Sequence, residues 1–123
     1  MPPVRSRLGE LAIRASFAPE AVTEGFRERS AANFAMPHTA EAALRENSDL
    51  GKPGLLDPSD LDLPILVVHG DGDQLSSLAI GRRIAEVSKS ADLWVVPGGG
   101  HMLPLTRPVP LAERIAGFIA PGR

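Results

Sequence analysis

Two short apolar runs in the second half of the chain lack the polar–apolar alternation of a strand with one exposed face. They span residues 65–68 and 93–96 and are rich in branched side chains. Continuous apolar strands of this kind are typical of parallel sheets that are covered on both faces. The pattern therefore predicts two buried strands in the C-terminal half.

The spacing of apolar residues predicts a helix after each strand. Ser76 or Ser77 can cap the first helix. Its apolar stripe consists of Ile80, Ile84 and Val87. Pro108 and Pro110 suit the first turn of the second helix. Its apolar face consists of Leu111, Ile115, Phe118 and Ile119. The order strand–helix–strand–helix predicts an α/β fold, in which the right-handed crossover makes the two strands parallel.

The N-terminal half has a helical texture, rich in Ala, Glu and Arg, over residues 8–47. Pro19 and Glu20 suit the first turn of a helix. In that helix Val22 and Phe26 are four residues apart and share a face.

Pro37 is a second predicted helix start in this half. The residues that follow it at helical spacing are Ala40, Ala43 and Leu44. A turn-rich stretch, residues 48–62, is predicted to be an irregular linker. We therefore divide the chain into a helical segment with its linker, residues 1–60, and a C-terminal lobe, residues 61–123.

Composition narrows the class of protein. The chain has 123 residues, 43% of them hydrophobic, and a net charge of −2, which fits one small globular domain. The sequence contains no stripe of basic residues of the kind that binds nucleic acid. No apolar run approaches the ~20 residues of a membrane helix. There is no cysteine, and the first ten residues lack the apolar core of a secretion signal. We expect a cytoplasmic protein without a metal, a cofactor or a membrane partner.

Two ionisable residues follow the predicted strands at the same distance. Asp73 lies five residues after Val68, and His101 lies five residues after Val96. Parallel strands of one unit end on the same side of the sheet, where sites of open α/β folds form. A carboxylate there can fix the tautomer of an imidazole that acts as a general base.

Each of these residues alone is an ordinary turn residue. Their matched placement favours a shared chemical role, with glycines 98–100 letting the chain turn sharply before the imidazole of His101. Asp71 competes with Asp73 for the role of the acid, because the sequence D-G-D contains both.

Three consecutive features carry a family resemblance: the stretch LPILVVHGDGD, the amphipathic helix after it and the stretch WVVPGGGHMLPLTRP. Together they resemble the C-terminal part of α/β-hydrolase-fold enzymes. The resemblance covers roughly residues 62–120. It implies that Asp73, in strand–H-G-x-x-D, is the triad acid and that His101, in strand–x-G-x-G-H, is the catalytic base. It also implies that His69 is a structural residue at the end of the acid-bearing strand. Residues 15–47 resemble, less specifically, the helical cap of such enzymes, and His38 within them is expected at the surface.

The nucleophile of this family has no counterpart in the sequence. No serine lies in a G-x-S-x-G elbow, the strained strand-to-helix turn that exposes the nucleophile. Ser76 and Ser77 are nearest to Asp73, but helix capping explains them better. An aspartate nucleophile would occupy the same absent elbow.

We therefore expect the cap and C-terminal lobe of a serine-type hydrolase for small esters or related substrates, a fragment that is inactive alone. The acid-bearing strand would keep an unpaired apolar edge, which invites self-association or complementation by a nucleophile-bearing half. The alternative is a non-catalytic interaction module or one half of a split or oligomeric hydrolase. A nucleotide-binding protein is disfavoured because no G-x-G-x-x-G or Walker pattern occurs.

Overall fold

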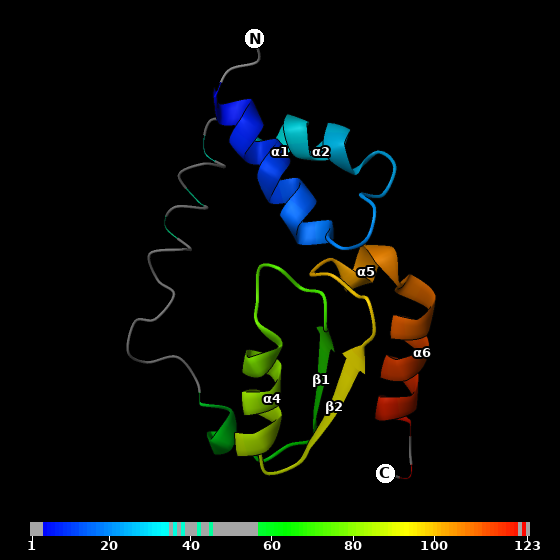
Figure 1. The fold of residues 1–123 in the computed structure, drawn as a ribbon. Coiled ribbons are helices and arrows are strands. Elements are labelled where there is room, and N and C mark those ends of the chain that lie inside the picture. Colours follow the sequence, from blue (N-terminus) through cyan, green and yellow to red (C-terminus); the bar gives the residue numbers. More distant parts are fainter. Residues whose placement is uncertain are drawn as a thin grey trace.

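The strand–helix–strand–helix order predicted for the C-terminal half is present, with one more short helix before the last. The computed structural model of the chain describes residues 4–34, 36, 38, 42, 45, 57–120 and 122. Its elements are α1 (Val4–Phe17), α2 (Phe26–Phe34), the 3₁₀ turn η1 (Pro58–Asp60), β1 (Ile65–Gly70), α4 (Leu78–Val87), β2 (Ala91–Val96), α5 (Leu103–Thr106) and α6 (Pro108–Ile119). In the view of Figure 1, α1 and α2 lie beyond one end of the sheet, and α4 and α6 lie on opposite sides of it.

The sheet consists of β1 and β2, which pair in parallel. Val68 is opposite Trp94, and Gly70 is opposite Val96. Both strands are two residues longer than predicted, β1 at its carboxyl end and β2 at its start. The predicted α/β class and the parallel strand–helix–strand unit are confirmed.

The helix α4 begins where the sequence predicts. The hydroxyl of Ser77 accepts a hydrogen bond from the backbone N–H of Ala79 at 3.3 Å, so Ser77 is the cap residue. Such a bond satisfies one of the backbone donors that the first turn of a helix leaves without a partner. Of the two serines that can cap this helix, Ser77 does so.

The apolar faces of the strands and helices are covered only in part. Val67 and Val96 are buried, but most other strand residues are half-buried. Ile80 of α4 is 53% exposed, and Ile119 of α6 is 72% exposed. The expectation that both faces of each strand are covered is therefore too strong for the described residues. The reason is geometric, because a sheet of two strands is too narrow to cover the full apolar stripe of a helix on either side.

The helix predicted to begin at Pro19 is wrong. α1 ends at Phe17, and a turn follows in which the N–H of Glu20 donates to the carbonyl of Phe17 at 2.8 Å. The next helix, α2, begins at Phe26, after Gly25 has adopted a φ of +72°. The carboxylate of Glu20 binds groups of the C-terminal half and does not cap a helix, as described below.

Most of the second predicted helix of this half, after Pro37, lies outside the described residues, as does the linker up to residue 56. Within that helix Ala42 and Arg45 are described, and both are helical. From Asp57 onward the linker is described and contains η1, whose start is capped by the side chain of Asp57. The division into residues 1–60 and 61–123 stays a prediction. No helix within the described ranges is both long and apolar enough to span a membrane.

Candidate active site

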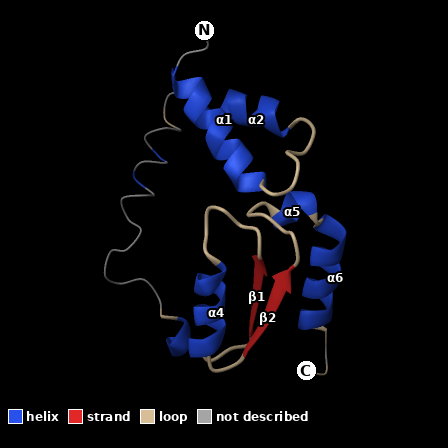
Figure 2. Ribbon diagram, viewed as in Figure 1, coloured by secondary structure: helices blue, strands red, loops and turns tan. Residues whose placement is uncertain are grey.

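The loops that follow β1 and β2 lie at the same end of the sheet. Figure 2 shows both loops at the carboxyl ends of the strands, on the side where α1 and α5 lie. Asp73 belongs to the first loop and His101 to the second. The parallel pairing of the strands therefore brings the two residues together from 28 positions apart in the sequence.

The carboxylate of Asp73 is fixed by its own loop. Its Oδ1 accepts hydrogen bonds from the backbone N–H groups of Leu75 at 2.8 Å and Ser76 at 2.9 Å. The side chain is 6% exposed. Because Oδ1 is held by the backbone, the orientation of Oδ2 toward the second loop is fixed as well.

Hydrogen bonding keeps this carboxylate ionised despite its burial. Burial raises the pKa of Asp73, but the bonds from the N–H of Ser76, the ring of His101 and the N–H of Leu75 lower it by more. The resulting pKa lies below the ordinary value of the group. A carboxylate that accepts several hydrogen bonds is stabilised in its charged form in this way.

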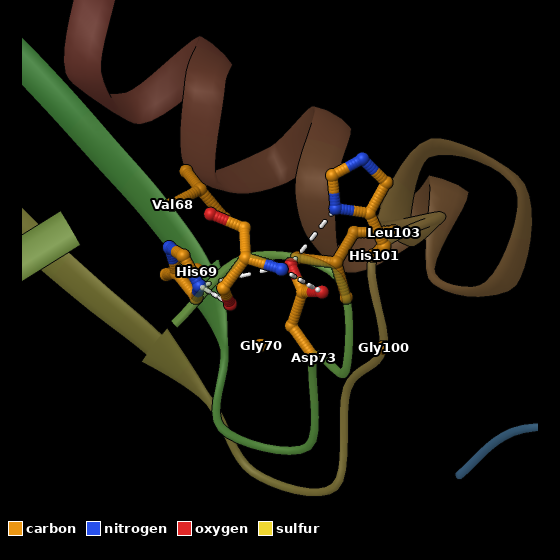
Figure 3. A pocket seen from close by; sticks show the side chains of 8 residues that line it. Val68, His69, Gly70, Asp73, Gly100, His101 and Leu103 are labelled. Carbon is orange, nitrogen blue, oxygen red and sulfur yellow. Dashed lines mark hydrogen bonds and ion pairs between the residues drawn. The ribbon is translucent and has the colours of Figure 1, made fainter. Parts of the chain in front are cut away.

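His101 points its ring at this carboxylate. Its Nδ1 lies 2.9 Å from Oδ2 of Asp73, and its side chain is 44% exposed. Since an ionised carboxylate can only accept, Nδ1 carries the proton of this hydrogen bond. The other ring nitrogen, Nε2, points away from Asp73 (Figure 3). In the neutral ring Nε2 then holds a lone pair and can accept a proton.

Asp71, the alternative acid, has a different partner. Its Oδ1 accepts a hydrogen bond from the backbone N–H of Gly98 at 2.7 Å. Gly98 has a φ of +67°, a conformation that glycine adopts without strain. Asp71 therefore holds the glycine turn in place, and the geometry favours Asp73 as the partner of His101. The catalytic roles of both residues stay a prediction.

His69 lies at the end of β1, as expected of a structural residue. Its Nε2 donates to the carbonyl of Ser76 at 2.9 Å and lies 3.7 Å from Oδ2 of Asp73. Its ring packs against α4, where a Cβ on Gly81 would come within 2.9 Å of Nδ1. His69 thus fixes the loop that carries Asp73. His38 is exposed, as predicted.

A cavity of about 200 Å³ surrounds the pair (Figure 3). Its lining consists of Val68, His69, Gly70, Asp73, Ser76, Gly100, His101 and Leu103. The backbone of Ser76 makes two of the bonds that fix the Asp73 loop: its N–H donates to Asp73, and its carbonyl accepts from His69. Among the residues described, no group of three potential ligand side chains is placed to hold a metal ion.

Glu20 lies outside the cavity but binds the loop that carries His101, a contact that the sequence does not reveal. Its carboxylate binds the backbone N–H of Gly100 at 3.1 Å, the hydroxyl of Thr106 at 2.7 Å and the guanidinium of Arg107 at 2.6 Å. These partners are 80 or more positions away. No local pattern announces such contacts, and the first-turn preference of Pro-Glu pointed to a helix start instead.

Comparisons with known proteins identify this fold. No model of a known protein family matches the chain. The chain is 37% identical to the non-heme chloroperoxidase CPO-A1 of Kitasatospora aureofaciens over an aligned stretch of 70 residues. This stretch covers 55% of this chain and 26% of the chloroperoxidase. An esterase from Exiguobacterium antarcticum matches with a TM-score of 0.77 and 17% identity over 94% of this chain and 42% of its own. A bromoperoxidase from Bacillus anthracis matches with a TM-score of 0.77 and 21% identity over 94% of this chain and 44% of its own.

The chain therefore has the α/β-hydrolase fold, as its resemblance to that family implies. It spans about a quarter of the length of the chloroperoxidase and less than half of each of the two solved structures.

Proposed function

We propose that this chain supplies the acid and the general base of an esterase-type hydrolase that acts on small esters. The observation that carries the proposal is the 2.9 Å contact between Nδ1 of His101 and Oδ2 of Asp73, with Nε2 directed away from it. In this proposal the serine nucleophile is contributed by polypeptide outside these 123 residues.

The geometry fits the two proton transfers of ester hydrolysis. Nε2 of His101 takes the proton of the nucleophile's hydroxyl while its oxygen attacks the ester carbonyl, and Asp73 stabilises the imidazolium that forms. The imidazolium then gives this proton to the departing alkoxide, which leaves as an alcohol. The acyl group is then esterified to the serine. In the second half-reaction Nε2 of His101 takes a proton from water, whose oxygen attacks the acyl carbonyl, and the serine oxygen leaves with that proton as the carboxylic acid is released.

Of the serines nearest to this pair, Ser77 uses its hydroxyl to cap α4, and Ser76 is bound to Asp73 and His69 through its backbone. The sequence contains no G-x-S-x-G elbow. A histidine and an aspartate without their nucleophile lose nearly all of the triad's rate enhancement, since its members act as a unit.

The names of similar proteins support the substrate class. Solved structures of similar fold include the Exiguobacterium esterase and a carboxylesterase from Bacillus subtilis, which has a TM-score of 0.74. The chloroperoxidase and the bromoperoxidase suggest a second candidate function, haloperoxidase activity. The two are separated by assaying ester hydrolysis and halogenation side by side.

The test is to express the chain alone and together with the polypeptide encoded immediately upstream of its Met1 codon. We expect no turnover of 4-nitrophenyl acetate by the chain alone. With the upstream polypeptide we expect hydrolysis that His101→Ala reduces by about 10³-fold or more.

Two results would contradict the proposal. Hydrolysis by the isolated chain that His101→Ala abolishes would place the nucleophile inside the chain, with Ser76 and Ser77 the first residues to substitute. An upstream sequence without an elbow, together with a stable inactive complex, would favour the non-catalytic interaction module.

A further inference from the structure

The end of α1 and the turn after it contact the loop that carries His101. This contact segment, residues 16–20, supplies four groups that meet the loop: the carbonyls of Ser16, Phe17 and Ala18, and the carboxylate of Glu20. It also touches the loop of Asp73, because a Cβ on Gly72 would lie 2.5 Å from Cδ of Pro19. The contact segment therefore lies against both halves of the acid–histidine pair.

We propose that Glu20, through its bonds to Gly100, Thr106 and Arg107, is a positioning residue that holds His101 in contact with Asp73. The meaning of this position for catalysis rests on the proposed function. The contact itself does not, and it can be tested without turnover.

The partners of Glu20 lie on both sides of His101 in the sequence. Oε2 accepts from the N–H of Gly100 at 3.1 Å and from the hydroxyl of Thr106 at 2.7 Å, while Oε1 lies 2.6 Å from Nε of Arg107. One carboxylate thus binds the residue directly before the histidine and two residues shortly after it. Its side chain is 15% exposed, so these bonds are partly shielded from water.

The backbone at His101 is fixed to the same segment. The N–H of His101 donates to the carbonyl of Ser16 at 3.1 Å. A Cβ on Gly100 would lie 2.5 Å from the carbonyl oxygens of Phe17 and Ala18, so only glycine permits this approach. With two consecutive amides bound to residues 16–20, the position of the His101 Cα is set, and the ring reaches Oδ2 of Asp73 from it.

The charge of Glu20 suits this role. Burial raises the pKa of Glu20, but the hydrogen bonds from Thr106, Arg107 and Gly100 lower it by more, and the resulting pKa lies below its ordinary value. Glu20 is therefore an anion at neutral pH, and its bonds to these donors are charge-assisted.

Glu10 offers a matched control. Like Glu20, it is a glutamate that binds arginine: its carboxylate lies 3.0 Å from the guanidinium of Arg14 and 3.1 Å from that of Arg27. Its partners belong to α1 and α2, and none of these contacts reaches the histidine loop. Glu10→Ala removes the same chemical group at a position with no predicted effect on His101.

The experiment compares the full chain with Glu20→Ala, Glu20→Gln and Glu10→Ala by NMR. It measures hydrogen exchange of the amides of Gly100 and His101 and the signal of the His101 Nδ1 proton, which is shielded from exchange by the bond to Asp73. In Glu20→Ala we expect both amides to exchange at least tenfold faster and the Nδ1 proton signal to weaken. Amides of the β1–β2 ladder should change by less than twofold, and Glu10→Ala should match the parent chain.

Glu20→Gln keeps an acceptor oxygen without the charge, so we expect a smaller effect in the same direction. It decides the question if Glu20→Ala fails to fold. Unchanged exchange at Gly100 and His101 with an unchanged Nδ1 signal, in whichever of the two variants folds, would overturn the proposal. Equal acceleration throughout the β1–β2 ladder would also overturn it, because it would mean a general loss of stability.

In an active assembly we further expect Glu20→Ala to lower kcat at unchanged KM, since Glu20 does not contact the cavity. If no assembly hydrolyses esters, the proposed function fails while the exchange measurements still decide the role of Glu20.

Discussion

At the scale of single residues, the two oxygens of Asp73 have separate tasks. Oδ1 binds the N–H groups of Leu75 and Ser76, and Oδ2 binds the ring of His101. The backbone bonds therefore orient the carboxylate before the histidine meets it. Asp71, two residues earlier, binds the glycine turn instead, so the two aspartates of D-G-D are expected to respond differently to the same substitution.

Asp73→Asn should preserve the loop and disable the histidine. The amide oxygen can still accept from the backbone, and this leaves the NH₂ group facing Nδ1. The ring must then accept at Nδ1 and carry its proton on Nε2, so it can no longer act as a base. We expect a loss of about 10⁴-fold in kcat of the active assembly, the size found for the wrong tautomer in a serine-protease triad.

The control for this prediction is Asp71→Asn, measured in the same ester assay. It should reduce kcat by less than about tenfold, because Asp71 acts only on the turn before His101. If kcat falls more in Asp71→Asn than in Asp73→Asn, Asp71 and not Asp73 is the acid that acts on His101.

The lowered pKa values of Asp73 and Glu20 predict how stability depends on pH. A carboxyl whose pKa is lower in the folded chain stabilises the fold above its unfolded pKa and loses this contribution as pH falls through the folded value. The ordinary values are 3.8 for Asp and 4.5 for Glu, so the loss should occur below about pH 4.5. Urea unfolding between pH 6 and about pH 3 should show a free energy that falls with pH, and less steeply in Glu20→Gln. Parallel curves would contradict the assignment for Glu20.

At the scale of elements, the sequence predicted the C-terminal half well because each of its signals is local. Only a few neighbouring residues are needed to recognise the strand and helix periods, the serine cap of α4, and the equal offsets of Asp73 and His101 from their strands. The role of Glu20 was missed because it depends on partners 80 or more positions away. The start of α2 was misplaced for a related reason, since the Pro-Glu pair preceding it serves a tertiary contact.

Two helical glycines provide a test of packing at this scale. A Cβ on Gly81 of α4 would lie 2.9 Å from Nδ1 of His69, whereas a Cβ on Gly117 of α6 would meet nothing within 4 Å. Replacing a helical glycine by alanine gains about 0.5–1 kcal/mol, but overpacking costs about 1–3 kcal/mol. Gly117→Ala should therefore raise the free energy of unfolding, and Gly81→Ala should lower it by about 1 kcal/mol.

Urea titrations of both variants would measure these changes. Stabilisation of equal size in both would show that His69 does not pack against α4 as described.

At the scale of the whole molecule, the N-terminal helices and the α/β lobe meet at residues 16–20. Phe17, at the end of α1, is fully buried, and its ring packs edge-to-face on Phe26 with the centroids 4.8 Å apart. Its carbonyl lies against Gly100 of the histidine loop. The same residue thus joins α1, α2 and the candidate active site, which makes it the position where loss of packing should uncouple the two parts.

Phe17→Ala tests whether the parts unfold together. Removing a buried phenylalanine side chain costs about 3–5 kcal/mol, a large share of the stability of a small domain. In the parent chain we expect probes in α1 and in the β1–β2 sheet to report one transition. In Phe17→Ala the N-terminal helices should lose hydrogen-exchange protection at lower urea concentration than the sheet.

The matched control is Leu11→Ala, because Leu11 lies on the same helix but is 63% exposed. Its effect on the free energy of unfolding should stay within about 0.5 kcal/mol. Coincident transitions in Phe17→Ala would mean that the two parts are coupled by more than this segment. The position of His101 would then depend on contacts spread across the whole interface, and Glu20→Ala alone should leave the Nδ1 proton signal unchanged. If the N-terminal helices unfold before the sheet and the Nδ1 proton signal disappears together with the protection of α1, the geometry of the acid–histidine pair depends on the docking of the N-terminal helices.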